Sequence, residues 1–257
     1  MWQHPFVNIF KTIRIGHEND DNKRLKKEGE VSYTLDDAVR MWALKIKGYV
    51  SAKNYVTIPA RTSESLDLHG RFMYIQLRAE PPKVFVVHIS VNTTKRTVVR
   101  FSFSNMHKEH KIKGNAVEIP CLLTQKWTVL SIDLPELLSK YGADGYDEGT
   151  FLSLKSVQMC STINVRNIFT SDTVYRPDDL PLEMGLKLPK GVSWSSRYRW
   201  TWVPAPPAPP AQGEESVLRE NVPRPAAQAK RPAAGSPPSQ KRHFSSNSIL
   251  REEISSD

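Results

Sequence analysis

The strongest constraint on the fold lies between Lys83 and Glu109, where a short polar segment separates two apolar runs. Val84 to Val91 is almost entirely β-branched or aromatic, and Thr97 to Phe103 alternates apolar side chains with charged and hydroxyl ones. Both patterns are typical of β-strands. The polar segment, Asn92 to Arg96, has the length of a hairpin loop. A hairpin this apolar is unstable alone in water, so it predicts the centre of a larger, covered sheet.

Further runs on both sides of the hairpin have the same character. An edge strand or a half-turn is expected within 5–15, and the charged segment 16–29 is expected to be a solvated loop. The other predicted strands are two pairs, 39–48 with 49–59 and 151–159 with 163–169, and three single runs, 66–77, 117–123 and 127–134. The sequence therefore predicts nine or ten short strands.

Helical character is confined to one stretch, PELLSKYG at 135–142. Pro135 suits the first turn of a helix, and Gly142 suits its end. Short strands at spacings of about 8–12 residues, without alternation of strands and long helices, are typical of an antiparallel sandwich. We therefore predict an all-β fold, an antiparallel jelly-roll-like β-sandwich with one short helix.

The distribution of proline divides the chain into parts. Ten of the 19 prolines lie between Pro204 and Pro238, and the residues beyond Val203 include few that can build a core. An apolar content of 39% and a mean hydropathy of -0.46 are also low for a chain that is packed throughout. We predict a β-sandwich domain at 1–190, a Trp/Arg-rich strip at 191–203 and a disordered, Pro-rich basic tail at 204–257.

The predicted domain is basic. The chain has a formal net charge of +9, and 27 Lys and Arg against 21 Asp and Glu precede Val192. A basic domain favours acidic or polyanionic partners, such as nucleic acid, an anionic membrane or the acidic face of a microtubule. No run approaches the ~20 apolar residues of a membrane span, and the first residues lack an apolar signal segment. We expect a soluble intracellular protein, with no membrane partner and with Cys121 and Cys160 as buried, reduced thiols.

Motifs for the common catalytic and metal sites are missing from the sequence. There is no G-x-S-x-G elbow, no Walker A loop and no G-x-G-x-x-G. His107 and His110 lack a Cys or carboxylate pair at zinc-ligand spacing. Asp144, Asp147 and Glu148 do not have the spacing of a calcium loop. We predict no enzymatic activity, no metal and no cofactor.

Lys and Arg gather in three places within the predicted domain. The hairpin tip carries Lys95 and Arg96. The loop that follows Asn105 carries Lys108, Lys111 and Lys113, and the 16–29 loop carries Lys23, Arg24, Lys26 and Lys27. Exposed lysines are ordinarily only solvated, but cations brought together from separate loops would form a composite basic face. These residues are the candidates for contact with an acidic partner.

Tryptophan supplies a second kind of candidate. The segment WSSRYRWTW interleaves rings with cations, namely Trp194, Arg197, Arg199, Trp200 and Trp202. Such a strip either packs back on the sandwich or anchors a partner protein. Exposed tryptophans could also bind sugar, so a carbohydrate-binding or other ligand-binding jelly roll is the alternative function. A sugar site depends on aromatic rings and little on salt, whereas an acidic partner depends on lysines and on salt.

Several blocks of sequence, in the same order, resemble one known family. They are GYVSAKNYVTIP, SLDLHGRFMYIQLR, VVRFSFSN, WTVLSIDL and SVQMCSTINVRNIFTSDTVYRPDDLPLEM. Over residues 2–190 they resemble the domain of cilia- and flagella-associated protein 20, the inner-junction protein of ciliary doublet microtubules. WQHPFVNIFK and RFSFSNMHKEHK are more similar to the N-terminal copy of this domain in the centriolar WD-repeat protein 90.

The resemblance implies a small β-sandwich without enzymatic activity that binds microtubule walls and braces or joins neighbouring tubules. It implies tubulin and other centriolar or inner-junction proteins as partners, and the centriole, basal body and ciliary axoneme as locations. No contact residue carries over, because the matching blocks are mostly sheet. The pattern departs from the family in two ways. Inner-junction proteins end soon after the segment that resembles LPLEM, whereas this chain adds a Trp/Arg-rich and Pro-rich tail. The WD-repeat relatives continue for many hundreds of residues that are not in this sequence.

Two short motifs in the tail have low specificity. The basic pairs Lys230-Arg231 and Lys241-Arg242 resemble a bipartite nuclear import signal, which predicts a minor nuclear pool. Ser236 precedes Pro237 and could accept a proline-directed phosphate. Neither motif changes the main expectation of a cytoplasmic, cytoskeletal protein for which nucleic acid is not a favoured partner.

Overall fold

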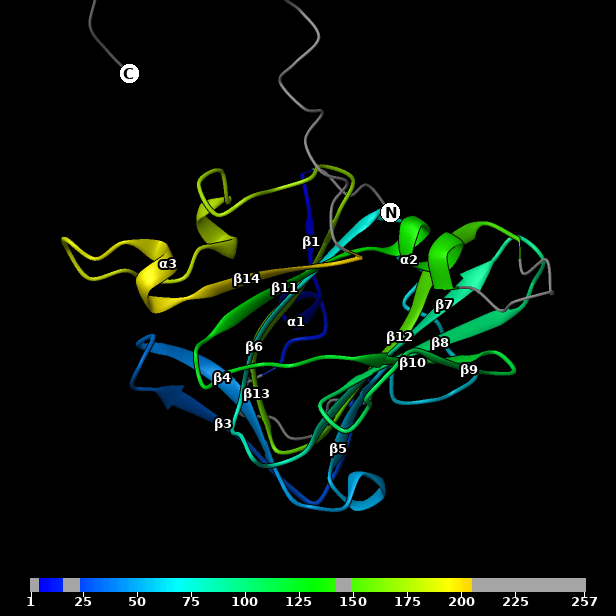
Figure 1. The fold of residues 1–257 in the computed structure, drawn as a ribbon, viewed down its shortest axis with the longest axis horizontal. Coiled ribbons are helices and arrows are strands. Elements are labelled where there is room, and N and C mark those ends of the chain that lie inside the picture. The colour runs from blue at the N-terminus through cyan, green and yellow to red at the C-terminus, as the bar shows by residue number, and fades with distance from the viewer. Residues whose placement is uncertain (1–4, 16–23, 142–148, 205–257) are drawn as a thin grey trace, which may run out of the picture. The chain divides into compact units, whose positions relative to one another are not determined.

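The computed structural model describes residues 5–15, 24–141 and 149–204. Within these residues the chain forms two seven-stranded sheets with a shared core and few helices (Figure 1). The predicted all-β sandwich is therefore confirmed. Several expectations lie outside the described residues, namely those on the tail beyond Pro204, on Lys23, and on Asp144, Asp147 and Glu148.

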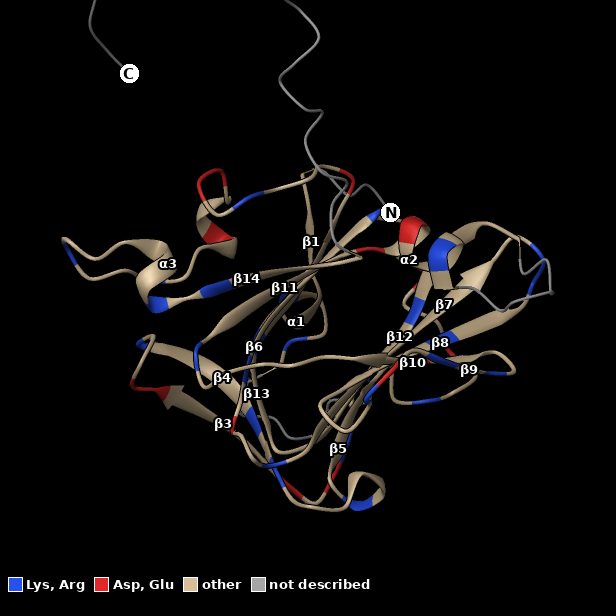
Figure 2. Cartoon of the chain, in the orientation of Figure 1, with Lys and Arg blue, Asp and Glu red and all other residues tan. Residues whose placement is uncertain are grey.

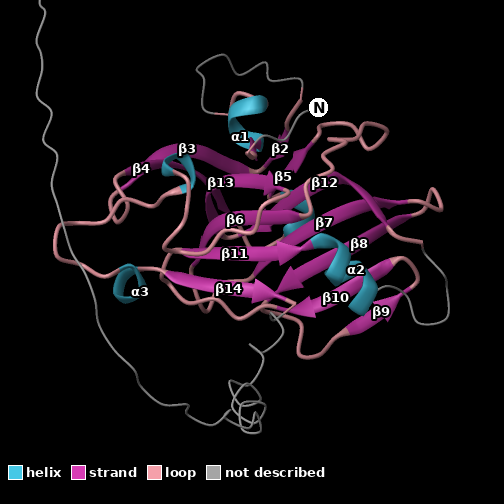
Figure 3. Ribbon diagram, turned by 90° about the horizontal axis from the view of Figure 1, so that it is seen from above, coloured by secondary structure: helices cyan, strands magenta, loops and turns pink. Residues whose placement is uncertain are grey.

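The strand order of both sheets can be followed in Figure 3. Sheet A has the order β14-β11-β6-β13-β4-β3, with β1 paired to β13. Its strands are β1 Val7–Asn8, β3 Glu30–Asp36, β4 Met41–Lys47, β6 Phe72–Ala79, β11 Thr128–Asp133, β13 Ile163–Ser171 and β14 Arg199–Val203. Sheet B has the order β2-β5-β12-β7-β8-β10-β9. Its strands are β2 Lys26–Glu28, β5 Tyr55–Ile58, β7 Phe85–Thr93, β8 Val98–Ser104, β9 Lys111–Lys113, β10 Ala116–Pro120 and β12 Phe151–Ser161.

The helices are short and connect strands. The predicted helix is α2, Leu134–Tyr141, and it buries its apolar side chains on the sandwich. Asp133 caps its first turn, because a carboxylate oxygen of Asp133 accepts a hydrogen bond from the backbone N–H of Glu136 at 3.2 Å. α1, Ile9–Thr12, follows β1 in the segment where an edge strand or a half-turn was expected. The helical turns that were not predicted are α3 Trp194–Arg197 and 3-10 turns at Ser51–Lys53 and Leu182–Met184.

The hairpin predicted from the sequence is confirmed and lies in the middle of sheet B. β7 and β8 pair in antiparallel register over Val86–Asn92 and Val98–Ser104. Residues 94–97 make the turn, in which Arg96 has a φ of 62°. β7 also pairs with β12, so it has a neighbouring strand on each side. Alternate side chains of β7 therefore enter the core between the sheets, while the others face outward.

Two predicted pairings are wrong, that of 39–48 with 49–59 and that of 151–159 with 163–169. The strands exist, but β4 belongs to sheet A and β5 to sheet B, and β12 belongs to sheet B whereas β13 belongs to sheet A. Alternation of apolar residues identifies the buried face of a strand and not the sheet that contains it.

Two of the points at which the chain crosses between the sheets are tied together, the one between β12 and β13 and the one between β4 and β5. Thr162 alone separates β12 from β13, and the preceding Ser161 has a φ of 68°. The Thr162 hydroxyl donates a hydrogen bond to the carbonyl of Gly48 at 3.0 Å. Gly48 follows β4 in the segment that leads to β5, so one side chain connects both crossings.

Within the described residues the structure has fourteen strands, more than the nine or ten predicted. Four of those not predicted are the strands at the ends of the sheet orders, β2, β3, β9 and β14. β2 and β9 read KKE and KIK and are exposed throughout, so no apolar alternation marks them. β2 takes the place of part of the solvated loop expected at 16–29. Two pairings, β8 with β10 and β11 with β14, are parallel rather than antiparallel.

Sheet A buries apolar side chains on both of its faces. Its inner face contributes to the main core, and its outer face carries a second apolar cluster that includes residues of the 172–198 segment. Tyr74 is fully buried there, and its hydroxyl oxygen accepts a hydrogen bond from the N–H of Tyr175 at 2.7 Å. The outer face of sheet B carries mostly polar and charged side chains instead.

The two cysteines provide a test of burial. Cys121 and Cys160 are both buried, as predicted, and burial raises the pKa of each thiol to about 12. Because the thiolate is the reactive form, both should react slowly with a thiol reagent at pH 8 in the native protein and quickly in denaturant. Rapid labelling of the native protein would mean that the side chains covering these two thiols open readily in solution.

The position of β14 leads to a prediction about where the stable part of the chain ends. β14 pairs with β11, and the neighbouring Tyr198 is only 2% exposed. A chain that ends at residue 204 should therefore be more stable than one that ends at residue 190, by about 3 kcal/mol or more, the usual cost of removing one large buried aromatic side chain. Urea unfolding followed by circular dichroism measures the difference. Equal midpoints for the two chains would place the end of the stable domain near residue 190.

Candidate functional site

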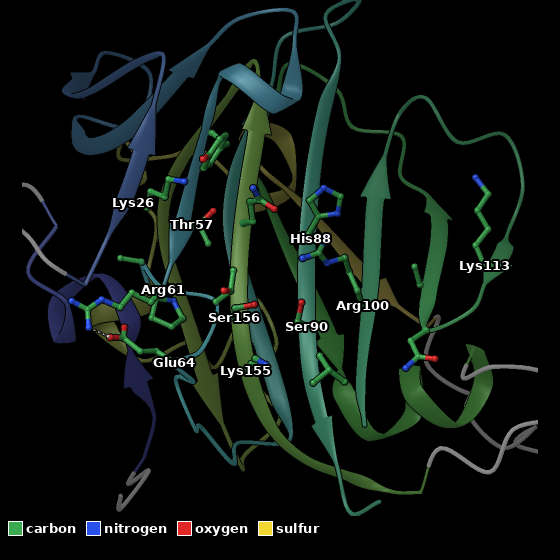
Figure 4. A pocket seen from close by; sticks show the side chains of 18 residues that line it. Lys26, Thr57, Arg61, Glu64, His88, Ser90, Arg100, Lys113, Lys155 and Ser156 are labelled. Carbon is green, nitrogen blue, oxygen red and sulfur yellow. Dashed lines mark ion pairs between the residues drawn. The ribbon is translucent and has the colours of Figure 1, made fainter. Parts of the chain in front are cut away.

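The outer face of sheet B forms an open trough that crosses its strands (Figure 4). The volume of the trough is about 580 Å³, and every strand of sheet B contributes to its lining. Figure 4 shows side chains from widely separated parts of the sequence on this one face. The trough is the site that we analyse as the candidate binding surface.

Strand register explains why these side chains share a face. Residues that are directly paired across neighbouring strands project their side chains to the same side of the sheet. Two adjacent rows of paired residues therefore run across sheet B. One row is Lys26, Thr57, Gln158, His88, Ser102, Glu118 and Lys111, and the other is Ser156, Ser90, Arg100, Ala116 and Lys113.

Small polar side chains form the floor of this face. Ser90 and Ser102 are only 5% and 8% exposed although they face outward, because longer side chains surround them. His88 Nδ1 lies 2.7 Å from the Oγ of Ser102. Burial, with a smaller contribution from the charge of Arg100, lowers the pKa of His88 to about 4. The floor is therefore uncharged near pH 7.

Cations surround this uncharged floor. The lining includes Lys26, Arg61, Arg100, Lys113 and Lys155. The one carboxylate among the described lining residues is Glu64, whose Oε1 lies 3.8 Å from Nη1 of Arg61. Just outside the lining, Oε1 of Glu118 lies 2.6 Å from Nζ of Lys113. The trough therefore presents a surplus of positive charge over negative charge.

The cations chosen from the sequence fall into two separate groups on sheet B. The first group lies on or beside β2, at one edge of the sheet, and comprises Arg24, Lys26 and Lys27. The second lies on the β7–β8 turn, on β9 and on the loop before β9, and comprises Lys95, Arg96, Lys108, Lys111 and Lys113. Every described member of both groups is exposed. In Figure 2 all Lys and Arg of the described residues are blue, and this colour is visible at β9. Only Lys26 and Lys113 line the trough.

Sequence reasoning missed three cations of the trough, Arg61, Arg100 and Lys155. A signal for the face itself was present in the hairpin, where His88, Ser90 and Arg100 occupy alternate positions of otherwise apolar strands. Arg61 lies in the loop after β5, and Lys155 lies at a register shift of β12, so neither follows that alternation.

The Trp/Arg-rich strip packs on sheet A. The rings of Trp194, Trp200 and Trp202 follow one another with centroid distances of 5.9 and 6.0 Å, and each side chain is partly buried. Arg197 donates a hydrogen bond to a backbone carbonyl, while Arg199 is exposed. The role of these residues as partner anchors stays a prediction.

The described part of the chain contains no group of three His, Cys, Asp or Glu side chains that could hold a metal ion. The two histidines weighed as ligands contact different residues. His107 Nδ1 lies 3.8 Å from Oε2 of Glu118, and the ring of His110 stacks on Tyr141 with centroids 4.5 Å apart. No helix among the described residues has the length and apolar character needed to span a membrane.

The contact between His88 and Ser102 brings a base and a hydroxyl together in a form unsuited to catalysis. A general base works best when its pKa is near the working pH, and a third group usually orients it. His88 is a weak base because its pKa is about 4, and its partner Ser102 is buried in the floor. This contact does not suit catalysis, whereas the surplus of positive charge around the floor suits the binding of an anionic ligand.

Comparison with known proteins identifies one domain and several relatives. The CFA20 domain profile matches residues 1–188. WD repeat-containing protein 90 of Mus musculus is 34% identical over 226 residues, which cover 77% of this chain and 12% of that protein. Centriole proteome protein 16 of Chlamydomonas reinhardtii is 37% identical over 209 residues, which cover 80% of this chain and 10% of that protein. The chain thus spans about a tenth of the length of these two relatives.

A third relative has a length similar to the domain. Cilia- and flagella-associated protein 20 of Paramecium tetraurelia is 25% identical over 189 residues, which cover 73% of this chain and 95% of that protein. Among solved structures, an exo-beta-agarase is 7% identical with a TM-score of 0.34, over 68% of this chain and 26% of that one. A likeness this weak supports no inference about function.

The pKa of His88 leads to a prediction about stability in mild acid. The pKa is about 4 in the folded chain and ordinarily 6.5. Between these values the unfolded chain binds a proton at this site and the folded chain does not, so the free energy of unfolding falls as the pH is lowered from 7 to 4. A shift of this size corresponds to about 3 kcal/mol. Below pH 4 both states bind the proton, and His88 causes no further loss.

Urea unfolding of the wild-type protein and of the His88→Gln variant, at several pH values from 7 to 4, isolates this effect. The other histidines are present in both proteins, so their contributions cancel in the difference. The wild type should lose about 3 kcal/mol relative to the variant over this range. Parallel pH profiles would show that His88 is accessible to protons in the folded chain.

Proposed function

The chain belongs to the CFA20 domain family, and on that premise we propose that it is a microtubule-binding structural module of centrioles, basal bodies and ciliary axonemes. In this role it braces or joins neighbouring tubules, as a component of an inner junction or inner scaffold, and performs no catalysis. Its partners are tubulin and other centriolar or inner-junction proteins.

The names of the relatives support this location. One is a centriole proteome protein, and another is a cilia- and flagella-associated protein. The aligned region covers 95% of the latter, so in Paramecium a protein of about the length of this domain is associated with cilia. The WD-repeat relatives are far longer, so the proposal concerns the part that this chain spans.

The observation that carries the microtubule contact is a group of exposed cations beside the trough. We name it the basic rim, and it consists of Lys95, Arg96, Lys108, Lys111 and Lys113. Microtubule walls carry many Asp and Glu side chains, so the charges are complementary. Each exposed ion pair contributes only about 0.2–1 kcal/mol, so contact requires several cations together.

A carbohydrate-binding jelly roll is the second candidate, and one observation favours it. Trp42 is 55% exposed, and its ring stacks on that of Tyr33 with centroids 5.5 Å apart. These rings lie on β4 and β3 at the edge of sheet A, so a sugar site would be centred there. We rank this function second because Tyr33 already covers one face of the exposed tryptophan ring.

Reversal of charge on the basic rim tests the microtubule contact. In the full chain, four residues are changed together, Lys95→Glu, Arg96→Glu, Lys108→Glu and Lys111→Glu. Lys113 is left unchanged because it pairs with Glu118. Co-sedimentation with taxol-stabilised microtubules at low salt should weaken at least ~10-fold, about 1.4 kcal/mol, and targeting to centrioles in cells should weaken with it.

The comparison variant carries Arg24→Glu, Lys26→Glu and Lys27→Glu at the opposite edge of sheet B, and circular dichroism verifies folding of both variants. Wild-type binding should also decrease as salt is raised from about 50 to 300 mM. If both variants and the wild type bind equally well, and salt has no effect, the basic contact is wrong.

A further inference from the structure

Four of the five cations of the trough lie on alternate strands of sheet B. The first, third, fifth and seventh strands each contribute one cation to the lining. These four, which we name the cation series, are Lys26 on β2, Lys155 on β12, Arg100 on β8 and Lys113 on β9. The strands between them contribute only uncharged side chains to the lining. Neighbouring strands lie about 4.8 Å apart, so Lys155, Arg100 and Lys113 follow one another at about 9.6 Å across the sheet. Arg100 and Lys113 both pair with Ala116, and Lys155 adjoins Ser156 in the same row, whereas Lys26 is level with Gln158, three residues further along β12.

We propose that the trough binds an extended acidic segment of a partner protein, laid across the strands, with a carboxylate at about every third residue. A polyproline II chain advances about 3.1 Å per residue, so three residues cover about 9.3 Å, close to the spacing of Lys155, Arg100 and Lys113. Its three residues per turn place every third side chain on the same side. Three carboxylates over seven residues then match the distance from β12 to β9, about 19 Å.

The charges of the cation series differ in how far they are already neutralised. Lys113 pairs with Glu118, and Lys26 lies over the ring of Tyr55 at 5.5 Å. Arg100 is exposed and Lys155 is partly exposed, and neither forms an ion pair within the described residues. The two middle members are therefore the ones that an incoming carboxylate would neutralise most effectively.

The floor supplies partners for the backbone of such a segment. Ser90, Ser156 and Gln158 line the trough between the cations. Their hydroxyl and amide groups can donate hydrogen bonds to carbonyl oxygens and accept them from N–H groups. An extended peptide has both kinds of group free, because its backbone makes no internal hydrogen bonds.

An acidic peptide fits the trough better than a single-stranded nucleic acid does. Proteins that bind single strands usually provide several aromatic rings on which the bases stack. Tyr55 is the one Phe, Tyr or Trp in the lining among the described residues, and Lys26 lies over its ring. The lining therefore offers charge and hydrogen bonds without a stacking surface.

This inference does not rest on the microtubule contact. Arg100 and Lys155 lie outside the basic rim, and Lys113, the one residue common to both groups, is unchanged in the rim variant. Peptide binding is measured without microtubules, so a negative result for one proposal leaves the other standing.

Fluorescence anisotropy with the full chain tests the proposal. The probe is a labelled peptide of four Glu-Pro-Pro repeats, because this sequence adopts polyproline II and presents its carboxylates on one side at the required spacing. At about 50 mM salt it should bind at least ~10-fold more tightly than the peptide of four Gln-Pro-Pro repeats, and added salt should weaken it. A peptide of the same composition with its four Glu residues in a row should also bind more weakly.

Variants assign the binding to the trough. Arg100→Glu with Lys155→Glu should weaken binding of the Glu-Pro-Pro peptide at least ~10-fold. Lys26→Glu, on an exposed edge strand, provides a second variant that leaves the middle of the sheet unchanged. Lys187→Glu with Lys190→Glu makes the same charge change at two exposed positions of the 172–198 segment and should have no effect. Circular dichroism verifies that each variant is folded.

Three results would overturn the proposal. The first is equal affinity for the Glu and Gln peptides, and the second is equal affinity for the spaced and consecutive Glu peptides. In the second case the trough attracts polyanions without regard to spacing. The third is tighter binding of an oligothymidylate of about twelve nucleotides, which would indicate a nucleic-acid surface instead.

Discussion

The geometry of the trough depends on the pairing of β7 with a strand on each side. β12 and β8 together satisfy its backbone hydrogen bonds and fix its register. Because successive side chains point to opposite faces, Val87 and Ile89 enter the core while His88 and Ser90 face outward. Each buried aliphatic side chain contributes about 1.5–3 kcal/mol, and a slip of one residue would expose the whole inner set. The outward position of the polar floor is thus a consequence of the core.

The sequence predicted those features that a local pattern determines. The hairpin, α2 and the sandwich class follow from apolar alternation and from Pro135, whereas strand partners depend on distant parts of the chain. The positive φ of Ser161 at the crossing is not indicated by its residue type, since glycine and asparagine are the usual residues there. Lys26 could be chosen from local charge density alone. Arg100 could not, because its role depends on the register that places it beside Ser90 and Ala116.

The two outer faces of the sandwich differ in what covers them, and only the outer face of sheet B remains open as a candidate site. The 172–198 segment and β14 bury the outer face of sheet A around Tyr74. The outer face of sheet B keeps its serines, its histidine and its cations. Its edge strands β2 and β9 are short and rich in lysine, which disfavours the pairing of additional strands at the edges. The broad face, rather than an edge, is therefore the surface that sheet B offers to a partner.

The single residue between β12 and β13 has a mechanical consequence. Both strands have a neighbour on each side within their own sheets, so covalent backbone joins the interior of sheet B to the interior of sheet A through Thr162. Sliding one sheet past the other would have to break the hydrogen bond between Thr162 and Gly48 as well as the packing of the core. A force applied to one layer would therefore pass through the covalent backbone at this residue into the middle of the other layer.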